Sequence, residues 1–196
     1  MQKWLTLTVL FLAPLPALAQ QPAAGAPAAN PLLSEWTTPF GVPPFAEIKT
    51  EHFLPAIQEG IAQHNRELEA IASNSAAPSL ANTIEALEAS GKLLDRVTSV
   101  FSNLSSAETN DALQAVQKQV APMMAAHRDD IRLNEALFRR VKAIWEAQEG
   151  LGLDPDQKKL LDNTWKDFVR GGALLPKEGK QRFRAINGEL ASLSVK

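Results

Sequence analysis

Helical periodicity is the feature that most limits the fold of this chain. From Thr50 almost to the last residue, apolar side chains recur at steps of three, four and seven, which is the spacing of one face of an α-helix. No stretch has the alternating pattern and turn residues of a β-hairpin, and no internal repeat recurs. The sequence therefore predicts an all-α fold of about six amphipathic helices.

Capping residues mark the first two expected helices. Thr50 can cap the first, whose apolar face repeats through residues 54–71. Asn82 followed by Glu85 resembles a capping box, and it predicts a second helix that carries its apolar face on to Leu104. Gly91 lies within this second helix, where a glycine indicates a close contact with a neighbouring helix.

The next two helices have a proline and an asparagine as their main markers. A third helix is expected from near Thr109, and Pro122 inside it predicts a kink or a break. Asn134 can cap a fourth helix, which is expected to end near Gly150.

The last two helices have the clearest boundaries. Asp154, Pro155 and Gln157 stand at the N-cap, first and third positions of a fifth helix, which Gly171-Gly172 closes. A sixth begins near Pro176, and no glycine, proline or capping signal ends its apolar face before the sequence does. We therefore expect residues 30–196 to be a helical region that is truncated within a larger protein.

Residues 1–19 have the layout of a secretory signal peptide. Lys3 supplies the positive charge, Trp4–Leu15 is a short apolar run, and Ala17-Leu18-Ala19 is a small-x-small cleavage site. Cleavage after Ala19 predicts export to a bacterial periplasm. The alternative is a retained N-terminal anchor, for which the apolar run is short.

Two segments without helical periodicity follow the signal peptide. Residues 20–29 are rich in Ala, Pro and Gln and lack large apolar side chains, which predicts a flexible linker. Residues 30–49 are interrupted by prolines and predict an extended strap that lies over the helical body. Trp36, Phe40 and Phe45 are its expected buried anchors; a ligand for a proline-binding module is the alternative use of this segment.

Composition narrows the partners and the chemistry. The net charge is −2 and no stretch is strongly basic, so nucleic acid is not an expected partner, and neither is a membrane once the signal peptide is removed. The chain has no cysteine, which excludes disulfides and thiolate metal ligands. Its stability must come from packing.

The three histidines do not form the zinc motif of a metallopeptidase. None of His52, His64 and His127 belongs to a His-Glu-x-x-His sequence, which would place two imidazoles on one helical face. His127 lies on an apolar face and is expected in the core, whereas His52 lies in a first helical turn and suits a capping or solvated role. His64 and Glu67 are one turn apart and could bind an ion, but a surface pair is the commoner arrangement.

The paired carboxylates have ordinary explanations as well. Asp129 and Asp130 are expected on the polar side of a helix, and Asp154 and Asp156 at a helix start. Phosphate loops, serine-nucleophile motifs and calcium loops are absent from the sequence. We predict no catalytic, cofactor-binding or metal-binding residue in this chain.

Several segments, in order, resemble the N-terminal region of the peptidyl-dipeptidases (dipeptidyl carboxypeptidases) of the thimet-oligopeptidase-like zinc metallopeptidase family. They include an entry to the first helix, a start to the second, and the end of the fifth, and it is their order and spacing over about 160 residues that carries the resemblance. Shorter matches fall between and after them, at residues 90–91, 94, 121–122, 127, 131, 134, 137–138, 140–141 and 186–187. The main segments are NPLL at 30–33, FGVPPF at 40–45, IKTEHFLPA at 48–56, NTIEALE at 82–88 and FVRGGA at 168–173.

The resemblance implies a secreted zinc metallopeptidase that removes C-terminal dipeptides from oligopeptides. In that family zinc is held by a His-Glu-x-x-His helix and a downstream Glu, and the motif glutamate activates water. No residue of this chain matches those positions. The resemblance therefore implies channel-forming helices that bind no zinc and are inactive alone, while the full-length enzyme binds zinc. The alternative is a complete, non-enzymatic helical module for peptide binding or regulation.

Overall fold

The computed structural model describes residues 30–195, and these residues form the all-α fold that the sequence predicts. No strand occurs among them. The expected signal peptide (1–19) and linker (20–29) lie outside the described residues. The helices are α1 (Thr50–Ala72), a π-helical turn (Leu80–Glu85), α2 (Ala86–Ala89), α3 (Lys92–Ala107), α4 (Asp111–Arg132), α5 (Glu135–Ala147), α6 (Pro155–Arg170) and α7 (Lys177–Leu193), with short 3-10 turns at Pro39–Gly41 and Gln148–Gly150.

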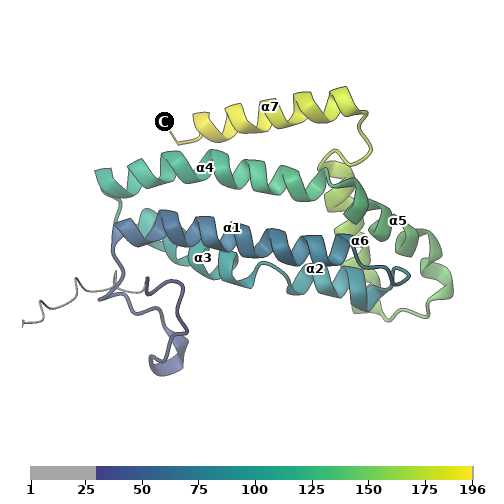
Figure 1. Ribbon diagram of the computed structural model, residues 1–196, viewed down its shortest axis with the longest axis horizontal. Helices are drawn as coiled ribbons and strands as arrows, with labels where there is room; N and C mark the ends of the chain where they lie inside the picture. Colours follow the sequence, from purple (N-terminus) through teal and green to yellow (C-terminus); the bar gives the residue numbers. More distant parts are fainter. Residues whose placement is uncertain (1–29, 196) are drawn as a thin grey trace, which may run out of the picture.

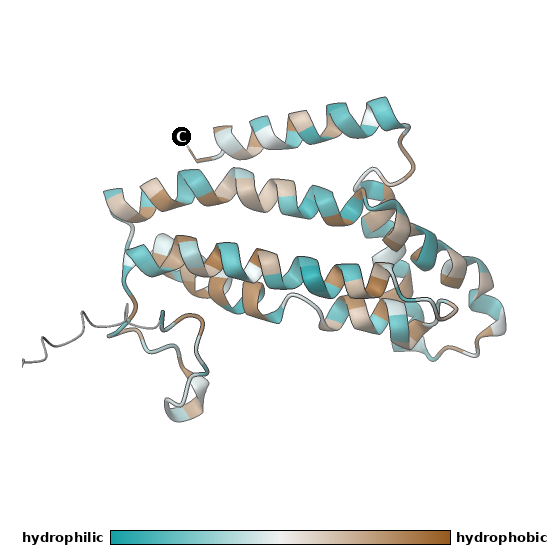
Figure 2. Ribbon diagram, viewed as in Figure 1, coloured by the Kyte–Doolittle hydropathy of each residue, from teal (hydrophilic) through white to brown (hydrophobic). Residues whose placement is uncertain are grey.

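The long helices are stacked roughly side by side, with α5 and α6 across one end (Figure 1). α1 packs against α3 and α4, and α7 packs on the other side of α4 as the outermost helix. Hydrophilic and hydrophobic residues are interleaved along each long helix, as amphipathic helices require (Figure 2). Among residues 30–195, no helix combines the length and the hydrophobicity needed to cross a bilayer.

Two clusters of apolar side chains form the core. The first joins α1, α3 and α4 around Phe53, whose ring centroid lies 5.1 Å from that of Phe101. The second lies at the α5–α6 end, where Phe138 and Trp165 stack with their centroids 5.3 Å apart. The two clusters divide the core along the length of α1, so that this helix contributes to both.

The strap is anchored by Leu32, which is not among the anchors predicted from the sequence. Leu32 is fully buried against the first cluster, and Trp36 packs beside it, with the Arg96 guanidinium 4.8 Å from the Trp36 ring centroid. The prediction that Phe40 and Phe45 are buried anchors is wrong, because both side chains are exposed. Phe40 lies in the 3-10 turn Pro39–Gly41, where its φ is 61°, and this turn is set apart from the stacked helices (Figure 1).

Three boundary predictions are confirmed by cap geometry. The Asn134 side chain accepts hydrogen bonds from the Ala136 and Leu137 amides at the start of α5. Asp154 and Gln157 form the expected capping box of α6, which ends before Gly171. Each of these signals involves residues only a few positions apart in the chain, which is why the sequence reveals them.

Four other boundaries differ from the prediction. Lys49, not Thr50, is the N-cap of α1, and Ser79 is the N-cap of the π-helical turn, in which Asn82 is the third residue. The expected second helix is divided at Ser90-Gly91, where Gly91 adopts a left-handed φ of 74°. α4 is continuous through Pro122, so the predicted break is absent there, and buried side chains occur both before and after the proline.

Candidate functional site

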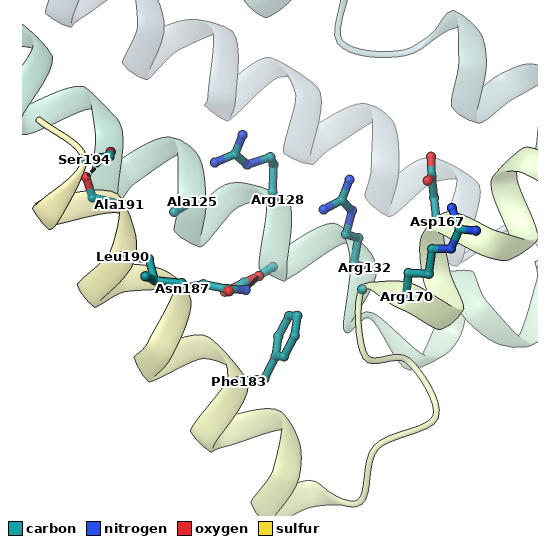
Figure 3. A pocket seen from close by; sticks show the side chains of 12 residues that line it. Ala125, Arg128, Arg132, Asp167, Arg170, Phe183, Asn187, Leu190, Ala191 and Ser194 are labelled. Atoms are coloured by element: carbon teal, nitrogen blue, oxygen red, sulfur yellow. Dashed lines mark hydrogen bonds between the residues drawn. The ribbon is translucent and has the colours of Figure 1, made fainter.

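A cleft lies between α4, α6 and α7. Its volume is about 540 Å³. α4 contributes Arg128 and Arg132, α6 contributes Asp167 and Arg170, and α7 supplies the remaining wall (Figure 3). The wall from α7 is largely apolar and consists of Phe183, Leu190 and Ala191 together with Asn187 and Ser194.

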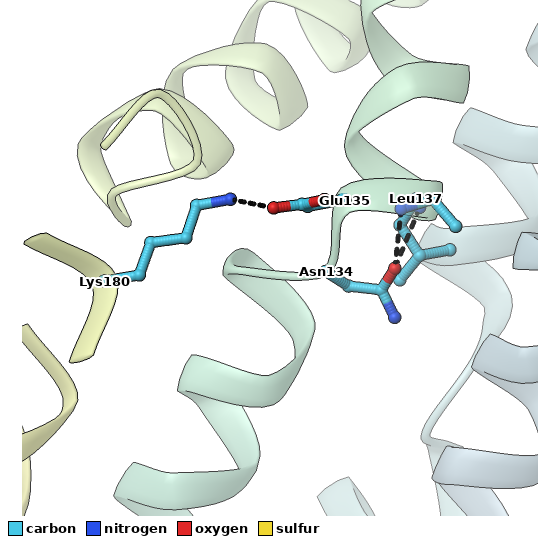
Figure 4. A network of polar contacts seen from close by, with 5 residues as sticks. Asn134, Glu135, Leu137 and Lys180 are labelled. Carbon is cyan, nitrogen blue, oxygen red and sulfur yellow. Dashed lines mark hydrogen bonds and ion pairs between the residues drawn. The ribbon is translucent and has the colours of Figure 1, made fainter. Parts of the chain in front are cut away.

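Polar contacts hold α7 in place along one side of this cleft. Asn187 Nδ2 donates to Asp129 Oδ1 at 2.7 Å, and Arg184 pairs with Asp130. Nearer the start of α7, Lys180 Nζ donates to Glu135 Oε1 at 3.0 Å (Figure 4). This bond lowers the pKa of the Glu135 carboxyl. α7 has no buried residue, so its position depends on these contacts and on half-buried side chains.

The prediction that Asp129 lies on the polar, solvent-facing side of its helix is wrong. Asp130 is exposed, as expected of the polar side of a helix, but Asp129 is only 4% exposed. It is covered because α7 returns over this face of α4 and places Asn187 against it. A contact across 58 residues of sequence leaves no local signal in the Asp-Asp pair.

A second hollow adjoins the cleft and contains a pair of histidines. Its volume is about 200 Å³, and it shares Arg132 and Asp167 with the cleft. His64 of α1 bonds through Nε2 to Ser90 Oγ and through Nδ1 to His127 Nε2 of α4, each at 3.0 Å. The two rings meet edge to face, with centroids 5.0 Å apart.

The directions of these hydrogen bonds determine which ring nitrogen carries the proton in each histidine. Ser90 Oγ donates to the Leu87 carbonyl at 2.7 Å, so it accepts from His64 Nε2–H. His64 Nδ1 is then an acceptor, and His127 Nε2–H donates to it. His127 Nδ1 is buried and has no partner among the described residues. Both imidazoles are therefore neutral, and Ser90, whose proton is already donated to a carbonyl, is not arranged as a nucleophile.

Burial lowers the pKa of both imidazoles. For His64, Glu67 and Asp95 act in the opposite direction; for His127, the neighbouring His64 adds to the lowering and Asp130 opposes it. Arg132, Asp167 and Glu88 also line this hollow.

Because both pKa values are lowered in the folded protein, the free energy of unfolding should fall as the pH is lowered. Because the folded-state pKa lies below the unfolded value of about 6.5, the unfolded chain binds more protons, and the stabilisation present above about pH 6.5 is lost below it. Urea unfolding between about pH 8 and about pH 5 should show this decrease, and a His64→Gln/His127→Gln double variant should show a flatter profile over that range. Equal slopes for the two proteins would contradict the assignment of neutral imidazoles.

The remaining predicted residues have structural roles. Glu67 Oε2 accepts from the Gly91 amide at 2.7 Å, which lowers the pKa of the carboxyl. His52 Nδ1 accepts from the Lys49 amide, which confirms a capping role, and the expectation that His127 is a core residue is also confirmed. Among residues 30–195, no group of three His, Asp or Glu side chains is placed to hold a metal ion.

The predictions from the sequence do not include the cleft arginines. Arg128 and Arg132 are one helical turn apart on α4, a spacing that places both on one face and that could have been noticed. Arg170 gives no such signal, because it reaches the cleft only through the packing of the end of α6 beside α4.

Comparison with known proteins gives a consistent group of relatives. The chain is 45% identical to a dipeptidyl carboxypeptidase of Salmonella typhimurium and 42% identical to one of Escherichia coli, over 84% of its own length in each case. It is 30% identical to an oligopeptidase A of Salmonella typhimurium over the same share. The chain spans only 24% of the length of each of these relatives. No model of a protein family matches it.

Proposed function

We propose, from the relationship of this chain to the dipeptidyl carboxypeptidases, that it forms the N-terminal helical part of a peptidase that removes dipeptides from the C-terminus of oligopeptides. The observation that carries the proposal is the 45% identity over 84% of the chain. Identity at this level extends over 164 residues of the chain. It therefore supports a shared overall architecture rather than a single shared motif.

In the proposed enzyme, these helices form part of the wall of the peptide channel. Zinc and the residues that hold it are supplied by the remaining part of the protein. The helical part formed by this chain is not catalytic by itself. The cleft between α4, α6 and α7 supports this assignment, since it is a hollow of peptide-binding size with both charged and apolar walls. The proposal includes export to the periplasm through residues 1–19.

A chimeric enzyme tests the proposal. The matched 24% of the Salmonella dipeptidyl carboxypeptidase is replaced by residues 30–196 of this chain, and release of dipeptides from an oligopeptide with a free C-terminus is followed by chromatography. We expect zinc-dependent release by the chimera. Two controls are expected to release no dipeptide. One is the Salmonella enzyme from which the matched part has been removed without replacement, and the other is this chain by itself.

Two results would contradict the proposal. One is a chimera that folds, as judged by circular dichroism and a cooperative melt, yet releases no dipeptide. The other is release of dipeptides by this chain alone. Tight peptide binding by the isolated chain, combined with a folded but inactive chimera, would favour the alternative of a non-enzymatic peptide-binding module.

A further inference from the structure

Three arginines from two helices line the cleft. Arg128 and Arg132 extend in the same direction from α4, and Arg170 lies next to them at the last position of α6 (Figure 3). Two carboxylates, Asp129 and Asp167, also line the cleft. The cleft therefore carries one more positive than negative charge.

The stem of Arg132 lies close to Gly171. A Cβ added to Gly171 would lie 2.5 Å from Arg132 Cδ and 2.7 Å from its Cβ, so the stem of the arginine lies directly against the Gly171 backbone. Gly171 is buried, and its φ of −74° does not itself require glycine. The absence of a side chain at this position is therefore explained by the path of Arg132 across the end of α6.

The charges of the cleft are arranged so that the arginines remain available. Asp129 is buried and accepts from Asn187, on the side occupied by α7. Among residues 30–195, no carboxylate lies within ion-pair distance of any of the three guanidinium groups. By contrast, Lys180 and Arg184 of α7 are both paired.

An apolar wall stands opposite the arginines. Phe183 of α7 is half-buried and extends toward α4, whereas Leu190 is 58% exposed at the edge of the cleft. A ligand in this cleft would thus meet guanidinium groups on one side and an apolar surface on the other. Oligopeptides with acidic residues present this combination, and a guanidinium group matches the planar geometry of a carboxylate with paired donors.

We propose that the cleft between α4, α6 and α7 binds acidic peptides, with a side-chain or C-terminal carboxylate on Arg132 and Arg170 and a neighbouring apolar residue against Phe183 and Leu190. This inference deepens the proposed function and rests on it, because it names the class of oligopeptide that the helical part receives.

Fluorescence anisotropy with two labelled peptides tests the inference on the purified full chain. The peptides are identical except that one carries glutamates and the other glutamines, and both have amidated C-termini. A third peptide with glutamines and a free C-terminus distinguishes a terminal from a side-chain carboxylate. We expect the peptides with carboxylates to bind about tenfold more tightly than the amidated glutamine peptide, and added salt to reduce this preference.

Variants locate the site. Arg132→Gln and Arg170→Gln should each reduce the preference for carboxylates by about three- to tenfold, whereas Arg182→Gln, which removes the same charge from an exposed position of α7 outside the cleft, should preserve it. Gly171→Ala should reduce it as well, because the new methyl group displaces Arg132.

The inference is wrong if the glutamate and glutamine peptides bind equally, or if Arg182→Gln weakens binding as much as Arg132→Gln does. Displacement of the glutamate peptide by inorganic phosphate at equal concentration would also overturn it, because the site would then recognise any anion. Dipeptide release by the chimera does not depend on an acidic preference, so these results leave the proposed function standing.

Discussion

Replacing Arg140 with methionine should lower the free energy of unfolding by about 2 to 4 kcal/mol. Arg140 is only 7% exposed, and its guanidinium donates to four acceptors in the segment between α1 and α2. These acceptors are Thr83 Oγ1, Asn82 Oδ1 and the carbonyls of Asn74 and Ala76. Methionine retains the apolar stem but removes the donor to the buried Thr83 hydroxyl and to the Asn74 and Ala76 carbonyls, whereas Asn82 Oδ1 still accepts from the Ser79 amide. Loss of the charged donor to the buried Thr83 hydroxyl is expected to be the costliest of these changes.

Arg139 offers a matched control for this prediction. It precedes Arg140 on α5 and is exposed, so Arg139→Met removes the same charge from the same helix without removing a buried hydrogen bond. The free energies of unfolding of the two variants, measured with urea, should differ by most of the decrease predicted for Arg140→Met. Arg140→Lys should fall between them, because an ammonium group has fewer donors and lacks the fork geometry. Equal stabilities of the Arg139 and Arg140 variants would disprove the role assigned to the buried guanidinium.

Arg140 also illustrates which part of the fold the sequence could predict. Asn134 caps the helix that carries Arg140, and this cap is readable because donor and acceptor are two or three positions apart. The acceptors of Arg140 lie 57 to 66 positions earlier in the sequence. An arginine among the apolar residues of α5 indicates only that some partner must exist, and the chain's path determines which one.

The same distinction applies to the candidate site. The apolar periodicity identified α4, α6 and α7 as helices, but not that α7 would lie along α4 and enclose a cleft between them. Consequently the cleft arginines were overlooked, and Asp129 was assigned to solvent although α7 covers it. A histidine on an apolar face was recognised in His127, whereas its bond to His64 depends on the crossing of α1 and α4.

Replacing Gly91 with alanine should lower the free energy of unfolding by about 2 to 4 kcal/mol. Two independent constraints act at this position, one from the backbone conformation and one from a neighbouring side chain. The Gly91 φ of 74° disfavours any residue with a side chain. A Cβ at this position would also lie 2.8 Å from His64 Cε1 and 2.9 Å from His64 Nδ1. The His64 ring would have to move, and its bonds to Ser90 and His127 would be lost with it.

Two other glycines serve as controls, because one has only the backbone constraint and the other has neither. Gly152 has a φ of 62° with nothing within 4 Å of an added Cβ, so Gly152→Ala should cost only the backbone penalty of about 1 to 2 kcal/mol. Gly188 lies within α7 and also has open space, so Gly188→Ala should be neutral or stabilising by up to about 1 kcal/mol. Urea unfolding of the three variants should therefore rank Gly91→Ala as the most destabilised and Gly188→Ala as the least.

A double variant isolates the contact with the histidine. In a His64→Ala background the ring is absent, so Gly91→Ala should cost no more than Gly152→Ala does in the original protein. The difference between the two backgrounds measures how strongly the break between α2 and α3 is coupled to the histidine pair. An equal cost of Gly91→Ala in both backgrounds would show that the left-handed backbone alone requires glycine there. The close approach of the His64 ring would then make no contribution to that requirement.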